Sequence, residues 1–122
     1  MQTLLNDFEA RLRLAILTAN EPFLFYTDVG KECYTGVMAW SLKGFVKALN
    51  EVDLRAIEFH VSNGDFESWA QNSLRDKKLA TELKKIKDTK ENGEKLRETI
   101  LNSAKQRYTA LQKQIQDATE LF

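Results

Sequence analysis

Four potential helix N-caps fall within 36 positions of this chain: Ser41, Asp53, Asp65 and Asp76. Ser and Asp cap helices because a side-chain oxygen accepts a hydrogen bond from a backbone N–H that the first turn leaves unpaired. Apolar residues follow each cap at steps of three and four, which places them on one helical face. The spacing predicts short helices joined by tight corners and packed as a compact bundle.

Glycine and proline are scarce, with five and one among 122 residues, which favours helices over a loop-rich or β-rich chain. The aromatic segment 23–28 follows Pro22 and is short, so we predict a strand there. Residues 37–40 form its partner strand or lead into the next helix. We therefore expect a mainly α fold, a compact bundle of short helices with a small N-terminal β-hairpin and a long C-terminal helix.

Residues 2–19 are predicted to form a core-packing helix, which Asn20 and Pro22 end. Its apolar stripe consists of Leu4, Leu5, Phe8, Leu12, Ala15 and Ile16. The N-terminus lacks the basic start and long apolar core of a signal peptide, and no apolar run approaches the roughly 20 residues that span a bilayer. A single cysteine, Cys33, forms no intrachain disulfide, and we expect a cytoplasmic protein.

The last helix is expected at about Glu94 to Glu120, after a break at Asn92-Gly93. Its apolar residues alternate three and four steps, as in a heptad seam. The seam consists of Leu101, Ala104, Tyr108, Leu111, Ile115, Ala118 and Phe122. It must pack on the bundle or on a second copy, and we predict a homodimer. We expect residues 1–86 to form the helical domain with its hairpin and residues 87–122 the long helix, in one structural unit.

The corner between two of these helices holds the only histidine of the chain, His60. One interpretation is an acid/base or ligand-binding pair, in which His60 titrates near neutral pH and Asp65 or Glu67 orients it. Tyr26 and Trp69 would then line a small-molecule pocket with them. The alternative is structural: a half-buried histidine hydrogen-bonded at a helix end, and an Asp65 that caps the next helix. We favour the structural interpretation.

Other chemistry has little support. Nothing in the sequence places the Cys33 thiol beside His60 or at a helix N-terminus, where it would be activated as a nucleophile. One His and one Cys cannot supply a usual zinc set, and there is no phosphate-binding glycine loop. We therefore predict no catalytic residue, no metal ligand and no cofactor, and lean towards a protein that is not an enzyme.

Charge is unevenly distributed along the chain. Residues 75–113 carry twelve Lys/Arg against six Asp/Glu, and the remainder carries six against twelve. The basic half would attract an anionic partner or the acidic half of the same protein. A basic run is present at Lys77, Lys78, Lys84, Lys85, Lys87 and Lys90. Nucleic-acid binding through residues 77–90 is a third hypothesis, which we do not favour because recognition positions are not obvious and Asp65, Glu67 and Asp76 are acidic.

The corner has the sequence Phe59-His60-Val61-Ser62-Asn63-Gly64-Asp65-Phe66-Glu67-Ser68-Trp69. It resembles a signature like Phe-His-x-x-Arg-Gly-Asp-Phe-x-x-Trp in a family of small uncharacterised prokaryotic domains. The likeness continues along most of the chain, at Pro22-Phe23, Phe25-Tyr26, Tyr34-Thr35-Gly36, Ser41-Leu42, Asp76 with Leu79-Ala80, and Gly93-Glu94-x-Leu96-Arg97. Asn63 stands where the family has arginine. If that arginine binds an anion or pairs with Asp65 in relatives, this chain has lost the contact.

The resemblance implies no established activity. Similar short signatures inside larger proteins favour an interaction or regulatory module over a free-standing enzyme, by analogy. Our leading hypothesis is a non-enzymatic protein-interaction or regulatory module that self-associates through its last helix. The first alternative is a ligand-binding or catalytic pocket around Tyr26, His60, Asp65 and Trp69, and the second is nucleic-acid binding. We expect no membrane association.

Overall fold

The computed structural model describes the backbone of residues 18–120 and the side chains of residues 18–117. The helix predicted at its N-terminal end, with its stripe from Leu4 to Ile16, lies almost entirely outside the described residues. The same holds for two seam positions, the side chain of Ala118 and the whole of Phe122.

The aromatic segment forms the first strand of an antiparallel hairpin. Strand β1 spans Phe23–Tyr26, and β2 spans Tyr34–Ala39. A short 3₁₀ turn, η1 (Lys31–Cys33), lies between them. The strand prediction for 23–28 is confirmed except at its end, and the partner strand begins three residues earlier than the predicted 37–40. The register is irregular just before Tyr26, where the chain bends.

Three of the four predicted caps are confirmed. The side chain of Ser41 accepts a hydrogen bond from the backbone of α2 (Leu42–Glu51), and Asp53 and Asp76 do the same for the helices that follow them. Those helices are α3 (Leu54–Asn63) and α5 (Lys77–Asp88). These bonds satisfy N–H groups that a first turn leaves open, so each helix begins where the sequence indicates.

The fourth predicted cap is wrong. Helix α4 (Asp65–Asn72) begins with Asp65 as its first helical residue, and Gly64 occupies the N-cap position without a side-chain bond. Gly64 has φ 71° and ψ 20°, the left-handed conformation that glycine adopts without steric cost. Because one residue both ends α3 and starts α4, no position is left for a capping side chain, and the Asp65 carboxylate is free to bond elsewhere.

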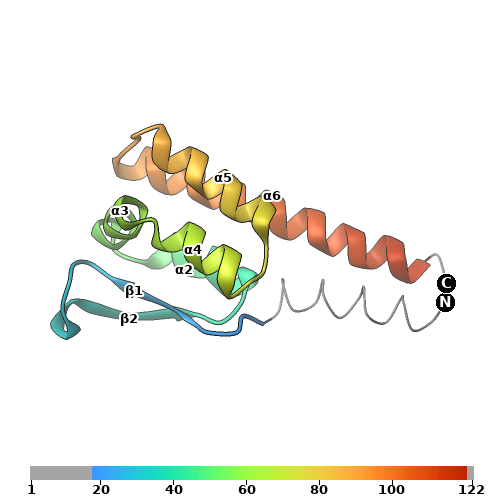
Figure 1. The fold of residues 1–122 in the computed structure, drawn as a ribbon, viewed down its shortest axis with the longest axis horizontal. Coiled ribbons are helices and arrows are strands. Elements are labelled where there is room, and N and C mark those ends of the chain that lie inside the picture. Colours follow the sequence, from blue (N-terminus) through green and yellow to red (C-terminus); the bar gives the residue numbers. More distant parts are fainter. Residues whose placement is uncertain (1–17, 121–122) are drawn as a thin grey trace.

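The elements form three layers (Figure 1): the hairpin, then α2, α3 and α4, then α5 with the long helix α6 (Gly93–Glu120). Helix α6 contacts α2, α3 and α5, and its C-terminal part extends beyond the start of α5. The break at Asn92-Gly93 is confirmed, since Gly93 has a positive φ of 65°. The mainly α fold with a hairpin and a long last helix is therefore the one expected.

An aromatic cluster joins the hairpin layer to the middle layer. Phe23 lies at its centre, with ring centroids 4.7 Å from Phe25, 5.0 Å from Phe66 and 5.7 Å from Trp69. The pairs with Phe25 and Trp69 are edge-to-face, an arrangement that adds to the stabilisation from burying the rings. No helix within residues 18–120 is long and apolar enough to cross a membrane.

Candidate functional site

The imidazole of His60 makes a hydrogen bond at each of its two nitrogens. Nε2 accepts the backbone N–H of Tyr26 at 2.8 Å, and Nδ1 lies 2.8 Å from Oδ2 of Asp65. A nitrogen that accepts carries no proton, so the neutral ring has its proton on Nδ1 and donates it to Asp65. One side chain thereby connects β1, α3 and α4.

Local backbone geometry brings these two side chains together. The left-handed Gly64 turns the chain between α3 and α4, and its N–H bonds back to the carbonyls of His60 and Val61. The turn places Asp65 at the first position of α4, from where its carboxylate reaches the imidazole five residues earlier in the chain. Only the functional interpretation of the sequence included this contact, since the structural one assigned the Asp65 carboxylate to a helix cap. Neither interpretation included the third partner, the backbone of Tyr26.

The imidazole is buried, with 4% of the residue exposed, and lies among aromatic rings. Its ring centroid is 4.7 Å from Phe23, 5.6 Å from Phe66 and 6.0 Å from Phe25. Burial lowers the pKa of His60 below its ordinary value of 6.5, because the charged ring would lose its hydration, and the bond to Asp65 only partly opposes this. The neutral form is therefore the one that the fold selects.

The other two predicted ligand-binding residues contact other groups. Tyr26 contributes its backbone N–H to His60, while its ring packs against Tyr34 with centroids 5.3 Å apart. The indole Nε1 of Trp69 donates to the carbonyl of Glu21 at 2.7 Å. The four residues from Tyr26 to Trp69 thus connect the elements of the bundle.

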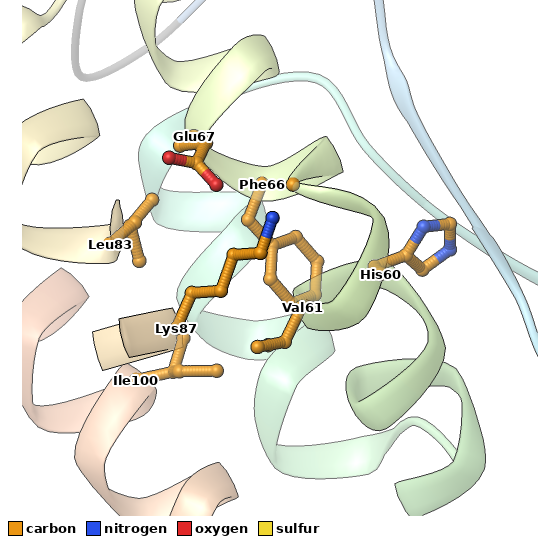
Figure 2. Close-up of a pocket in the computed structure, with 8 residues that line it drawn as sticks. His60, Val61, Phe66, Glu67, Leu83, Lys87 and Ile100 are labelled. Atoms are coloured by element: carbon orange, nitrogen blue, oxygen red, sulfur yellow. The ribbon is translucent and has the colours of Figure 1, made fainter. Parts of the chain in front are cut away.

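The cavity beside His60 has a volume of about 10 Å³, which is room for about one water molecule. Figure 2 shows the amine of Lys87 and the carboxylate of Glu67 pointing towards one another, and the imidazole pointing away from both. A Cβ on Gly64 would lie 2.9 Å from Glu67 Oε1 and 3.5 Å from Lys87 Nζ, so both charged groups lie close to that glycine. Glu67, named as a possible partner of His60, is thus placed beside a lysine.

Most of the predicted α6 seam packs within the single chain. Ala104 and Leu111 are buried, the latter with 2% exposed. Leu101, Tyr108 and Ile115 are partly buried and pack against the same core. A seam that is largely covered in one copy leaves less apolar surface for a second.

An ion pair that the sequence analysis missed joins α5 to α6. Arg107 Nε donates to Oδ2 of Asp76 at 2.7 Å, while Oδ1 of Asp76 accepts the N–H of Leu79. Only 5% of Asp76 is exposed. The two residues are 31 positions apart, so no local spacing could reveal the pair; the only clue was that Asp76 caps a helix rich in buried apolar residues.

The outer face of the hairpin carries three large apolar side chains that are about half exposed: Leu24 at 37%, Met38 at 47% and Trp40 at 53%. We call these three residues the hairpin patch. Leu24 and Met38 are cross-strand partners, and Trp40 follows Met38 by two positions, on the same face. The sequence analysis did not identify this patch, because strand alternation alone does not say which face of a short hairpin meets solvent.

The remaining candidates are isolated. The Cys33 thiol lies 3.6 Å from the carbonyl oxygen of Val29, and among residues 18–117 no three His, Cys, Asp or Glu side chains are placed to hold a metal ion together. Of the basic run, Lys77, Lys78, Lys84 and Lys85 are exposed on one side of α5. They form a charged surface without an aromatic platform.

Residues 20–122 match the model of a family described as a family of unknown function, DUF5752. The matched range contains the whole described fold apart from its first two residues. No curated protein and no solved structure shows significant similarity to the chain.

Proposed function

The chain belongs to the DUF5752 family, whose function is unknown, and we propose that it is a non-enzymatic protein-interaction module that binds through its hairpin patch. The observation that carries the proposal is the exposure of Leu24, Met38 and Trp40 side by side on one face. Trp and Met are enriched in the cores of protein interfaces, and half-exposed Trp side chains that become buried there supply much of the binding energy.

The hydrogen bonds of His60 at the corner between α3 and α4 support the same proposal. Both nitrogens of His60 are hydrogen-bonded within the fold, and the cavity beside the ring has room for only about one water molecule. A general base needs a nitrogen or oxygen that a substrate can reach, and here the accepting nitrogen is already bonded to Tyr26. The geometry at the corner therefore favours a structural role for His60 and Asp65 over a catalytic one. No observation at the corner supports the pocket hypothesis.

Self-association through α6 stays a prediction. With Ala104 and Leu111 buried in one copy, α6 offers a second copy only the partly buried side chains of the seam, such as Leu101 and Tyr108. Nucleic-acid binding through residues 77–90 also stays a prediction. It would appear as retention on DNA or RNA that weakens steeply with salt, because bound lysines release counterions from phosphates.

The proposed function is tested by affinity purification with the wild-type chain, Trp40→Ser and a control variant, Val29→Ser. Val29 is 79% exposed at the hairpin turn and outside the patch, so its loss leaves the patch intact. We expect a protein that is retained by the wild type and by Val29→Ser and lost by Trp40→Ser. Titration of that purified protein must then reproduce the difference as at least about a tenfold change in Kd. Equal binding of all three chains would overturn the proposal.

A further inference from the structure

Within the described residues, a single hydrogen bond connects the strands of the hairpin to the helices. It runs from the backbone N–H of Tyr26 to Nε2 of His60. No other hydrogen bond among residues 18–117 joins β1, β2 or the turn between them to a helix. The other contacts of β1 with the helices are made by buried rings, such as those of Phe23 and Phe25 with Phe66. The polar contact between strands and helices therefore depends on one imidazole nitrogen.

This nitrogen is also the one position on the ring where a further proton can bind. Nδ1 already carries the proton that it donates to Oδ2 of Asp65, so a second proton must bind Nε2. The protonated Nε2 is a donor, and it faces the N–H of Tyr26, which is a donor as well. Two donors form no hydrogen bond, and each would be left without an acceptor inside the fold. The charged ring and the observed position of Tyr26 therefore exclude one another.

Few charged groups lie near the imidazole. Asp65 on α4 favours the charged ring, whereas burial opposes it more strongly. Glu67 on α4 and Lys87 on α5 line the small cavity beside His60, but the imidazole points away from both (Figure 2). On α3 itself, the carboxylate of Glu58 bonds to the backbone at the start of α6. β1 has no charged residue, and the α6 residue that lines the cavity is apolar. The protonation of His60 is therefore governed by its burial and by Asp65.

Residues 26–34, which we call the hairpin tip, hold together by contacts of their own. The phenol of Tyr26, the only titratable group of β1, packs against the ring of Tyr34 with centroids 5.3 Å apart. The residues next to them in the turn share a backbone hydrogen bond of 3.0 Å. Phe25, just before the tip, is fully buried, and the strand register is irregular between these two positions of β1. Because an irregular register locally disrupts the ladder, the tip can move as a unit about this point.

A groove of about 390 Å³ lies between the hairpin tip and the connection from α2 to α3. Glu32 and Cys33 line it from the tip, and Asp53 and Arg55 line it from the connection. Asp53 and Arg55 pair with each other at 2.8 Å. No ion pair among the described side chains joins the tip to a helix. The groove thus leaves the tip room to move once its bond to His60 is broken.

We propose that His60 and the hairpin tip form a pH-dependent switch, in which protonation of the imidazole breaks the bond to Tyr26 and releases the tip from α3 while the helices stay folded. The tip is attached when the ring is neutral and released in acid. Because burial lowers the pKa of His60, the release occurs below pH 6.5. This inference goes beyond the proposed function and does not rest on it, since the hairpin patch belongs to the part of the hairpin that stays in place.

The test is an NMR titration of the wild-type chain from pH 7.5 to pH 4 that follows the His60 ring and the backbone amides together. We expect the amides of the hairpin tip to shift with the same midpoint as the ring, while amides of α5 and α6 show no transition there. Order parameters of the tip should fall from about 0.85 to below about 0.6 across that midpoint. A charged ring with a rigid tip would overturn the inference, and so would a ring that becomes charged only when the whole chain unfolds.

Two variants connect the tip to the histidine. Asp65→Asn removes the charge that favours the protonated ring but keeps an oxygen that can accept the Nδ1 proton. The midpoints of the ring and of the tip should therefore fall together, by about one pH unit or more. His60→Gln has no titrating ring, so the mobility of its tip should not change with pH.

The matched control is Glu32→Gln, which removes an exposed carboxylate from the hairpin tip itself. Its midpoint should equal that of the wild type, because Glu32 does not contact the imidazole. Circular dichroism at pH 7.5 shows which variants are folded. A tip transition that persists in folded His60→Gln, or that keeps its midpoint in folded Asp65→Asn, would assign the transition to another group and refute the switch.

Discussion

Arg107, in the middle of α6, donates from Nε to Oδ2 of Asp76, the residue that caps α5, over 2.7 Å. The carboxylate side chain is 3% exposed and the arginine side chain 18%. One oxygen of Asp76 holds the first turn of α5 and the other holds α6. A single carboxylate therefore fixes both the start of one helix and the position of the next against it.

Removing the arginine should be costly. In Arg107→Met the stem of the side chain is roughly kept, but Asp76 is left as a buried charge without its partner. We expect a loss of about 3 kcal/mol in the free energy of unfolding, measured by urea denaturation. Lys105→Met makes the same kind of change at an exposed position of the same helix and should cost less than about 0.5 kcal/mol. Equal losses in the two variants would contradict the role of the pair.

Stability should fall in mild acid because of His60. Its pKa in the folded protein is lowered by burial, so below pH 6.5 the unfolded chain binds a proton that the folded chain does not. The contribution of neutral His60 to the free energy of unfolding is fully present above the pKa that the histidine has in the unfolded chain. It is lost as the pH falls from about 6.5 towards the pKa of His60 in the folded protein, by up to about 1.4 kcal/mol per pH unit.

The measurement is urea denaturation of the wild type and of His60→Gln between pH 7.5 and pH 5. The variant is less stable at pH 7.5, since it loses the contacts to Tyr26 and Asp65, but the extra fall between pH 6.5 and pH 5 should be absent. Parallel curves for the two chains would show that His60 is not the titrating group.

The corner glycine should tolerate asparagine better than alanine. Gly64 has a φ of 71°, which costs an ordinary residue about 1–2 kcal/mol and asparagine less, because its side chain bonds locally to the backbone. A Cβ would also press on the Glu67 carboxylate at 2.9 Å, although that side chain can move. We expect thermal melting to rank the chains as wild type, Gly64→Asn and Gly64→Ala, in falling order. A stable Gly64→Ala would contradict the backbone argument.

The buried position of Leu111 leads to a test of the α6 seam. Leu111→Ala should destabilise the protein by about 2–5 kcal/mol if the side chain is buried in one copy. The melting temperature of the wild type then does not depend on protein concentration. If α6 pairs two chains instead, the melting temperature rises with concentration and light scattering reports a dimer. Melting at two concentrations a hundredfold apart distinguishes the two arrangements.

Local chemistry made much of the fold predictable. Ser41, Asp53 and Asp76 begin their helices by bonding N–H groups only two or three positions away, and Gly64 ends α3 through its own φ angle. Such interactions are encoded within one turn of chain, so their residue types and spacing suffice to find them. Asp65 shows where this reasoning fails: Gly64 occupies the N-cap position that the sequence assigned to Asp65, and the Asp65 carboxylate instead contacts the histidine five positions earlier.

The sequence by itself determined which segments between residues 18 and 120 are helical, where three of the helices begin, and that a hairpin precedes them, because those properties arise from contacts between near neighbours. Only the tertiary structure decided that the imidazole of His60 accepts the N–H of Tyr26, that Arg107 reaches Asp76, and that Trp40 faces solvent. These partners are 34 and 31 positions apart, and the exposure of a side chain depends on which layers cover it. The packing of the layers decides which distant residues meet and which side chains stay exposed. The periodicity of apolar residues along the chain does not predict that packing.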